Sequence, residues 1–273
     1  MTEEDFARLK SRFLRYVRGY RMETPAGQKN IALKRVHTLR VCRDAGIIAR
    51  DEGVSGNEAR LARAAALLHD AGRFPQYDRF RTFNDGDSVN HGLLGAEMVV
   101  KTGLLEGIAP EERSLIIRAV KYHNTFSIPR LDKRSAFLLK LVRDADKLDI
   151  WRVFIDYFGQ KKKDRPKAAG QGLPEGGGIS PAVLQGILGN RVVRLAEVKN
   201  LNDYKLLLLS WVYGLNFGAS FRLMRKRRLF GRLAARLPRG TDPRGRAASE
   251  AVAHLEEFIH KNLRVRAGAG MPR

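Results

Sequence analysis

The chain has 273 residues, of which 44% are hydrophobic and 29% charged, a balance that excludes a disordered protein and allows a sizeable core. The single cysteine, Cys42, excludes an intramolecular disulfide and a zinc site built from several thiolates. Because no apolar stretch follows the acidic residues 3–5, we predict no secretory signal and a cytoplasmic protein.

Two segments concentrate the net charge of +22. Their basic residues are Lys161, Lys162, Lys163, Arg165 and Lys167 in the first, and Arg222, Arg225, Lys226, Arg227, Arg228, Arg232 and Arg236 in the second. Such a surface attracts nucleic acid, acidic lipid headgroups or phosphorylated metabolites. The alternative is a solvated basic face of an arginine-rich protein, and the sequence leaves both open.

In the first half of the chain, apolar residues recur at helical spacing over three stretches, residues 2–18, 30–51 and 57–70. His37 falls on the inward stripe of the second, and the third ends at His69 and Asp70. We expect Gly72, just past that end, in the left-handed conformation. Residues 72–89 are rich in turn-forming residues and predict a long irregular loop.

Most of the remaining chain is also predicted to be helical. The expected helices cover residues 90–102, 110–122, 132–149, 181–188, 201–217, 219–237 and 247–263. Residues 159–200 are rich in Gly, Pro and Lys and predict a flexible region, with a short strand at 192–198. The prediction is therefore an all-α protein.

The longest uncharged run covers residues 206–221. As a helix it would be about 24 Å long, shorter than the ~30 Å hydrocarbon layer of a membrane. We therefore predict a buried core helix and no transmembrane segment. Peripheral membrane attachment, through this run and the basic residues after it, is a weaker hypothesis.

Four of the six histidines lie near a predicted helix end or on an inward face: His37, His69, His91 and His123. The other two, on the last predicted helix, are expected at the surface. Any one of the four is typical of a core or capping histidine. Together with Asp70 and Asp146 they would be costly to satisfy by hydrogen bonds alone. One or two divalent metal ions would satisfy them together, and imidazole and carboxylate ligands suit Mn, Fe, Ni, Co, Zn or Mg.

The order His37, His69-Asp70, Asp146 resembles the H…HD…D pattern of the HD superfamily of metal-dependent phosphohydrolases. The resemblance is closest at HDAGRF, NHGLLGAE, KYHN and RDADKLD, and it extends over roughly residues 28–155. It implies an HD-domain helical bundle with a helical C-terminal extension. The expected parts are an N-terminal helix and linker at 1–27, the HD domain at 28–158, the basic loop region at 159–200 and the extension, packing on the HD domain, at 201–273.

The resemblance implies that His37, His69, Asp70 and Asp146 bind one metal. It also implies that His91 and His123 bind a second metal or the substrate phosphate, as in the similar HD-GYP phosphodiesterases. This chain lacks their GYP segment, has Arg73 in place of their Lys, and has Asn124 in place of a second His. These departures argue against hydrolysis of a cyclic dinucleotide.

The chemistry expected of such a centre assigns roles to further residues. Asp70 is the candidate to bridge two cations, which lower the pKa of bound water so that hydroxide attacks phosphorus. Arg73 follows directly and is the first cation assigned to the phosphate. The other predicted substrate-binding residues are Arg79, Arg81, Lys147, Asp149 and Tyr77.

Three of these assignments have alternatives. Tyr77 is one of four aromatic residues between 74 and 83, which either stack on a nucleotide base or pack between helices. Asp149 either touches substrate or orients a ligand. Asp144 and Asp149 compete with Asp146 for the last ligand position, and the family pattern favours Asp146.

The leading functional hypothesis is a metal-dependent phosphohydrolase acting on a phosphomonoester or phosphodiester of a small phosphorylated substrate, with a nucleotide favoured. The second is a nucleic-acid-binding or regulatory protein on an HD scaffold, in which residues 222–236 carry the function and the metal is structural. The complete ligand set favours the enzyme. Oligomeric state is not predicted.

Overall fold

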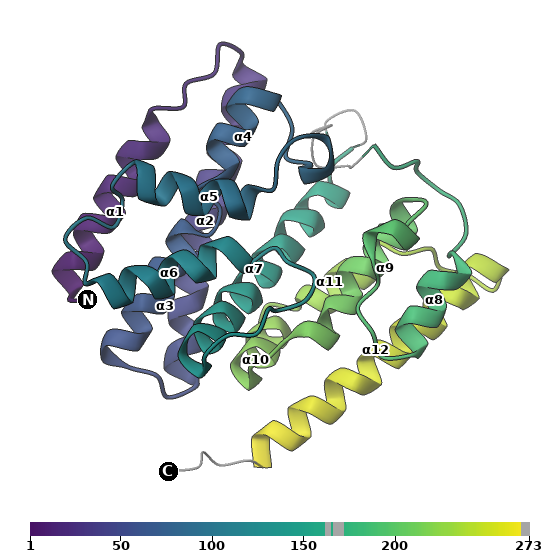
Figure 1. The fold of residues 1–273 in the computed structure, drawn as a ribbon. Helices are drawn as coiled ribbons and strands as arrows, with labels where there is room; N and C mark the ends of the chain where they lie inside the picture. Colours follow the sequence, from purple (N-terminus) through teal and green to yellow (C-terminus); the bar gives the residue numbers. More distant parts are fainter. Residues whose placement is uncertain (162–164, 166–171, 269–273) are drawn as a thin grey trace. The chain divides into compact units, whose positions relative to one another are not determined.

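The computed structural model describes residues 1–161, 165 and 172–268, with side chains through residue 263. Within these residues every regular element is a helix (Figure 1), which confirms the predicted all-α fold. The chain divides into two compact units, Met1–Asp149 and Ile150–Arg273. The boundary falls inside the long helix α7, so one helix contributes to both units.

The first unit contains the N-terminal helices. They are α1 (Glu3–Arg18), α2 (Pro25–Asp51), α3 (Gly56–Leu68), α4 (Arg73–Phe80), the 3-10 turn η1 (Asp85–Asp87), α5 (His91–Lys101), α6 (Pro110–Tyr122) and the first part of α7 (Lys133–Gly159). Helix α3 is central, because it packs against α1, α2 and α6, while α5 packs against α6 and α4. The run of alanines and leucines in α3 is almost completely buried. Neighbouring helices therefore approach α3 closely on several sides.

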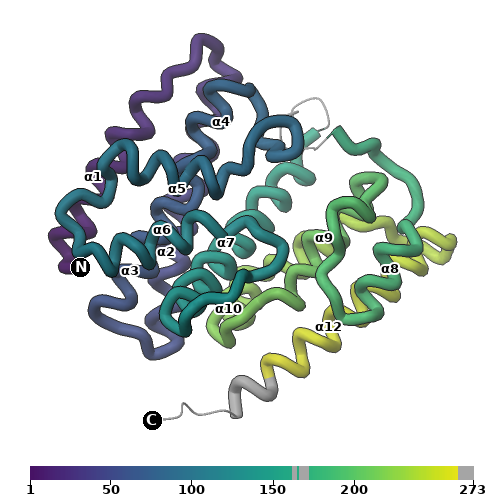
Figure 2. The backbone as a smooth tube through the Cα atoms, in the orientation of Figure 1, coloured from purple at the N-terminus to yellow at the C-terminus, as the bar shows by residue number. Residues whose placement is uncertain are grey.

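Two predictions for residues 72–89 are wrong. The segment is not irregular throughout, because residues 73–80 form α4. Pro75 lies in its first turn, where a missing backbone N–H costs no intrahelical hydrogen bond. Gly72 is right-handed, with φ −69° and ψ −19°, so the chain passes from α3 to α4 through a continuous turn. After α4 the chain continues through η1 to α5, as the tube in Figure 2 traces.

The second unit contains the shorter helices and a long last one. They are α8 (Pro181–Leu188), η4 (Leu195–Glu197), α9 (Leu201–Ser210), η5 (Trp211–Gly214), α10 (Gly218–Lys226), α11 (Leu229–Ala234) and α12 (Pro243–Gly268). Helix α12 packs against α8 and α10, and α9 packs against α11. On α12, His254 contacts Asn190 and His260 is exposed.

Several boundaries in this unit differ from the predictions. The short strand predicted at 192–198 is instead extended backbone and the 3-10 turn η4. The helix predicted at 219–237 is broken into α10 and α11 at Arg228, which takes a left-handed φ of 54°. The helix propensities of the residues do not predict such a break, because tertiary packing overrides them.

The uncharged run at 206–221 is largely buried, but it is not the single core helix that was predicted, because α9 ends at Ser210 and η5 and a loop separate it from α10. Leu206, Leu208, Leu209 and Val212 are each 0% exposed. Side chains that are buried in this way are not available for contact with a membrane, which argues against peripheral attachment through this run. In the described part of the chain, no helix is both long and apolar enough to span a bilayer.

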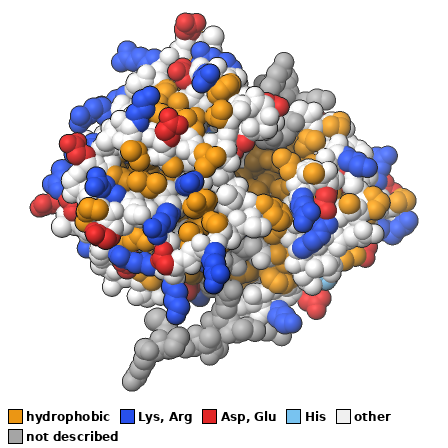
Figure 3. All heavy atoms as spheres, in the orientation of Figure 1, with side chains coloured by type: hydrophobic (Ala, Val, Ile, Leu, Met, Phe, Trp, Pro, Cys, Tyr) orange, Lys and Arg blue, Asp and Glu red, His pale blue; other side chains and the backbone are white. Residues whose placement is uncertain are grey.

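Basic side chains are spread over the face of the molecule that Figure 3 draws, and they are not gathered there in one patch. Of the first predicted basic segment, Lys162, Lys163 and Lys167 lie outside the described residues. Arg165 of that segment donates to the carbonyl of Gln160 and pairs with Glu175. Its charge is therefore engaged within the protein.

Candidate metal centre

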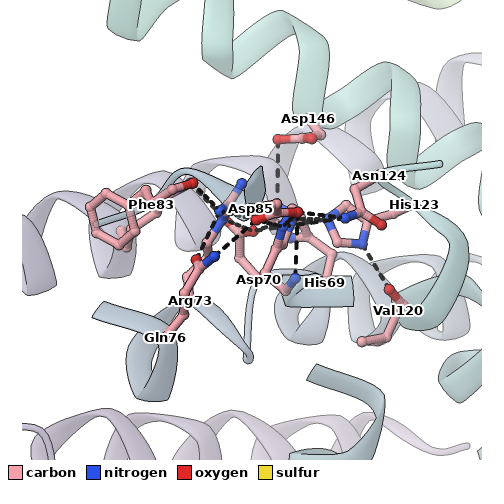
Figure 4. Close-up of polar contacts among 12 residues, drawn as sticks. His69, Asp70, Arg73, Gln76, Phe83, Asp85, Val120, His123, Asn124 and Asp146 are labelled. Atoms are coloured by element: carbon pink, nitrogen blue, oxygen red, sulfur yellow. Dashed lines mark hydrogen bonds and ion pairs between the residues drawn. The ribbon is translucent and has the colours of Figure 1, made fainter. Parts of the chain in front are cut away.

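Six residues from five helical segments converge inside the first unit, and Figure 4 labels His69, Asp70, His123 and Asp146 among them. They are His37 within α2, His69 and Asp70 at the end of α3, His91 at the start of α5, His123 at the end of α6 and Asp146 within α7. All four imidazoles are at most 5% exposed, and Asp70 is 2% exposed. The structure therefore brings together all six residues that the sequence assigned to metal binding.

The two carboxylate oxygens of Asp70 face two different sets of ligands. Oδ2 lies 3.5 Å from Nε2 of His37 and 3.6 Å from Nε2 of His69. Oδ1 lies 3.5 Å from Nε2 of His91 and 3.9 Å from Nε2 of His123. A carboxylate with ligands gathered around each oxygen has the arrangement of a bridging ligand.

We call the two sets the His37 half and the His91 half. The His37 half comprises His37, His69 and Asp146 with Oδ2 of Asp70, and Oδ1 of Asp146 lies 3.1 Å from Nε2 of His37. The His91 half comprises His91 and His123 with Oδ1 of Asp70, and the Nε2 atoms of the two histidines are 3.0 Å apart. Ligands that bind one ion at about 2.1 Å and at right angles lie about 3 Å apart, so both sets have nearly the right spacing.

Each histidine is held through Nδ1, which leaves Nε2 directed into the centre. His69 and His123, both at helix C-termini, place Nδ1 2.7 Å from the carbonyl oxygen three residues earlier. His37 and His91 instead place Nδ1 2.7 Å from a carboxylate, that of Asp149 and Asp85 respectively. Carbonyl and carboxylate oxygens only accept, so each Nδ1 is a donor and each neutral imidazole presents an acceptor at Nε2.

This donor set fits a metal ion. Within the described residues, Nε2 of His37, Nε2 of His69 and Oδ1 of Asp146 are buried without a hydrogen-bond partner. In the His91 half, two Nε2 acceptors face each other and Oδ1 of Asp70. Acceptors gathered without a donor repel one another unless a cation lies between them, and leaving them unpaired is costly.

The charges of the centre support the same conclusion. Burial raises the pKa of Asp70, but the nearby positive charges, that of Lys34 foremost, outweigh it and hold that pKa well below its usual range. Burial likewise opposes ionisation of Asp146, but the adjoining His37 and His69 outweigh it, so the pKa of Asp146 is also well below normal. Both carboxylates are therefore ionised at neutral pH.

The histidines of the His91 half favour the neutral form. Burial and the charge of Arg73 lower the pKa of His91 to about 4. Burial and the neighbouring histidines hold the pKa of His123 well below its usual range. A neutral imidazole is a metal ligand but a poor partner for a phosphate, because it presents a lone pair rather than an N–H at Nε2.

A comparison of the chain with models of protein families gives a match to the HD domain over residues 35–151. The chain contains an HD domain. This confirms the resemblance seen at His37, His69-Asp70 and Asp146, all of which lie inside the matched range. HD domains are generally metal-dependent hydrolases of the phosphohydrolase superfamily that bind divalent ions. No curated protein and no solved structure matches the chain.

Asp144, Asp146 and Asp149, the aspartates of α7 that compete for the last ligand position, have different surroundings in the structure. Asp146 faces His37 and His69, as described above. Asp149, one turn later and 1% exposed, bonds Nδ1 of His37 and also accepts from Arg40 at 2.6 Å. Two roles were considered for Asp149, contact with substrate and orientation of a metal ligand. Its contacts favour the second role, with His37 as the ligand that it orients. Asp144 is 0% exposed and belongs to none of the groups of described residues that could hold an ion.

Arg73 lies beside the centre, but its guanidinium is already engaged. Nη1 donates to Gln76 and Asp85 at 2.9 and 2.8 Å and also to the carbonyl of Phe83. Nε lies 3.5 Å from Oδ1 of Asp70. Arg73 therefore contributes positive charge next to the bridging carboxylate while being held by the loop that leaves α4.

Lys34, which directly precedes the residues that match the HD domain, is a cation beside the centre that the sequence did not point to. Its Nζ lies 2.8 Å from Oδ2 of Asp70 and 5.4 Å from the ring centroid of Phe83. The signal was present, because Lys34 precedes His37 by three residues on α2 and so shares its helical face. The spacing alone does not identify a functional lysine, because the contact with Asp70 depends on the fold and a surface lysine can have the same spacing.

The remaining predicted substrate-binding residues are placed less favourably. Tyr77 is 6% exposed, accepts from Asn30 and stacks on Phe83 with centroids 4.8 Å apart. Arg79 and Arg81 are exposed, and their described contacts are with Phe80, Met22 and Asp78 rather than with the centre. Lys147 follows Asp146 and is half-buried, and burial lowers its pKa to about 8.

Glycines allow the helices that carry the His91 half to approach closely. A Cβ on Gly72 would lie 2.2 Å from the carbonyl oxygen of His91 and 2.6 Å from the backbone nitrogen of Gly95. A Cβ on Gly92 would lie 2.5 Å from Oδ1 of Asn124. Gly72 is thus needed for space rather than for a left-handed φ, which corrects the reason predicted for it.

Proposed function

We propose that this protein is a metal-dependent phosphohydrolase that cleaves a phosphomonoester or phosphodiester of a small phosphorylated substrate, with a nucleotide the favoured class. The observation that carries the proposal is the pair of inward-facing Nε2 sets on the two oxygens of Asp70. In this proposal His37, His69, Asp70 and Asp146 hold one divalent ion, and Asp70, His91 and His123 hold a second. The absence of thiolate ligands leaves Mn, Fe, Ni, Co, Zn and Mg as candidates.

When bound, such ions lower the pKa of coordinated water and offset charge on phosphoryl oxygens. The chain's own groups account for the rest of the site. Asp70 and Asp146 are ionised and fixed in place before substrate arrives. Lys34 supplies an ammonium beside one oxygen of Asp70, and Arg73 supplies a positive charge beside the other. Both stabilise a phosphate by charge that needs no reorganisation during the reaction.

A nucleotide is favoured over a simpler phosphate ester because of the ring next to these cations. Phe83 is only partly covered and lies within reach of Lys34. A base or sugar placed over Phe83 would leave its phosphate near Lys34. Tyr77 supports this platform from behind through its stacking on Phe83, rather than by touching substrate as the sequence suggested.

The test is a screen of phosphomonoesters, phosphodiesters and nucleotides with purified protein loaded with Mn²⁺, repeated with the other candidate metals. We expect hydrolysis of at least one nucleotide and its loss in Asp70→Ala. A screen without turnover, or full turnover by Asp70→Ala, would contradict the proposal. An Asp78→Ala variant, altered at an exposed carboxylate on α4, controls for a general effect of removing acidic charge.

A second function is supported by the surface of α10 and α11. Arg222, Arg225, Lys226, Arg228 and Arg232 are exposed there, as a contact surface for phosphate backbones requires. In this alternative the metal is structural and the protein binds nucleic acid. Salt-dependent binding to RNA or DNA that persists in His69→Ala would favour it, and no binding at low salt would eliminate it.

A further inference from the structure

The two halves of the centre are supported by matching groups. In the His37 half, Asp149 bonds Nδ1 of His37 and pairs with Arg40. In the His91 half, Asp85 bonds Nδ1 of His91 and pairs with Arg73. Each half thus contains a chain of histidine, carboxylate and arginine. Nothing in the family resemblance pointed to Asp85, which lies between the recognised motifs.

Asp85 joins every element around the His91 half. Its Oδ1 accepts from Arg73 at 2.8 Å and from Gln76 at 2.9 Å, both on α4. Its Oδ2 lies 2.7 Å from Nδ1 of His91 and accepts from Asn124 at 3.0 Å. Figure 4 shows the carboxylate between the Arg73 and Asn124 side chains. One side chain therefore ties α4, the start of α5 and the end of α6 together.

The two supporting carboxylates differ in their surroundings. Asp149 lies within the long helix α7 with a side chain 1% exposed, whereas Asp85 lies in the three-residue turn η1 with a side chain 30% exposed. A short turn reached by water opens more readily than a buried helix interior. The support of the His91 half is correspondingly easier to lose.

We propose that Asp85 is the positioning residue of the His91 half, and that it makes this half a weaker, separately exchangeable metal site. The inference rests on the two-ion centre of the proposed function and adds an order to it. The His37 half fills first and holds its ion. The His91 half fills second, and its affinity depends on the carboxylate in η1.

Charge explains why Asp85 matters beyond geometry. The guanidinium of Arg73 adjoins both Asp85 and Oδ1 of Asp70, so it repels a cation bound in the His91 half. The negative charge of Asp85 offsets this repulsion and also favours the His91 tautomer with its lone pair at Nε2. Asp85→Asn keeps the shape of the side chain and most of its hydrogen bonds. It removes the negative charge that offsets the charge of Arg73.

The experiment measures metal content and affinity without substrate. Full-length wild type, Asp85→Asn and Asp149→Asn are titrated with Mn²⁺ alone, and the bound metal is counted by elemental analysis after dialysis at stepped free-metal concentrations. Wild type should bind two equivalents in two steps. Asp85→Asn should keep the tighter step and weaken the second by about 10- to 100-fold, the usual effect of removing a carboxylate behind a metal-binding histidine.

A control and a rescue separate positioning from general stability. Asp87→Asn changes another carboxylate of η1, which is exposed and contacts only Asn84 among the described residues, and it should leave both steps unchanged. Arg73→Gln in the Asp85→Asn background removes the uncompensated cation and should recover part of the second step. Loss of a merely structural contact would not be repaired by a second substitution that removes more contacts.

Three results would overturn the inference. They are a single step in wild type, equal loss of both steps in Asp85→Asn, and no change in Asp85→Asn. Because these results come from metal binding and not from turnover, they can be interpreted even if no substrate is found. Conversely, hydrolysis by a protein with one equivalent of metal would retain the proposed phosphohydrolase activity and refute the second metal site on which this inference rests.

Discussion

The His37 half and the His91 half share Asp70 and use the same residue types, but the chain builds them differently. His37 and Asp146 project from the interiors of α2 and α7, each 27 residues long. His91 and His123 stand at helix ends, and His91 is supported by Asp85 in η1. A side chain within a long buried helix is fixed by packing on both sides, whereas one at a helix end depends on the adjoining loop.

The difference shows how one centre can combine a permanent ion with an exchangeable one. The Asp149 support of the His37 half is almost inaccessible to water, and the Asp85 support of the His91 half is partly accessible. Identical ligands therefore need not have identical affinities, because the groups behind them set both orientation and charge. The predictions that follow test this contrast, beginning with the residue that both halves share.

Asp70→Ala removes the ligand common to both halves and should have the largest effect. We expect a loss of kcat/KM of at least about a hundredfold, since both charge stabilisation and metal retention depend on it. Metal analysis should find less than one retained equivalent after dialysis. Retention of two equivalents would refute the bridging assignment, and the exposed Asp78→Ala serves as the control.

Asp149→Asn should affect the His37 half in particular. Affinity for the tighter ion should fall by about 10- to 100-fold, because His37 loses the carboxylate that orients it and Arg40 is left without its partner. Competition with a metal chelator measures the change. If the weaker step moved instead, the assignment of the two halves would be reversed.

Gly72→Ala should disturb the His91 half through the backbone. The added Cβ would lie 2.2 Å from the carbonyl oxygen of His91, so α5 must move away from α4. We expect a destabilisation of about 1–3 kcal/mol, typical of overpacking, with the second metal step weakened more than the first. Thermal unfolding and metal titration measure both effects.

The matched control for this prediction is Gly86→Ala. Its Cβ would meet nothing closer than Oδ1 of Asn84 at 3.4 Å. Its melting temperature should stay close to that of wild type. A similar loss of stability in both variants would show that the close approach of Gly72 is not the cause.

Lys34→Met should act on the substrate rather than on metal retention. The ammonium beside Oδ2 of Asp70 is expected to contact the phosphate, so KM should rise about three- to tenfold while both metal steps persist. Steady-state kinetics on the substrate found in the screen measure this. Lys29→Met changes an exposed lysine of the same helix and should leave KM unchanged, and an unchanged KM in Lys34→Met would exclude the phosphate contact.

Arg79→Gln and Arg81→Gln should have the smallest effects. Both arginines are exposed, and neither contacts the centre among the described residues. We expect kcat/KM to stay within about twofold of wild type, as for surface charges remote from a site. A larger effect would restore the substrate-binding role suggested by sequence position alone.

Local sequence determined the helices and the order of the ligands. Helical spacing and capping signals are properties of neighbouring residues, so α1, α5 and α6 were predictable. The H…HD…D order also survives without a structure, because the family pattern is itself a sequence pattern. Local signals were weaker for α4, because the proline in its first turn made the segment look like part of a loop.

Tertiary structure alone decided which atoms meet. Asp149 supports His37 across 112 positions of sequence, and Asp85 reaches Asn124 across 39. No local spacing encodes such contacts, because they depend on how α2, α5, α6 and α7 pack. For the same reason, the sequence could name Asp70 as a bridging candidate but could not show that each of its oxygens faces a separate pair of histidines. That division into two unequal halves is a property of the packed helices.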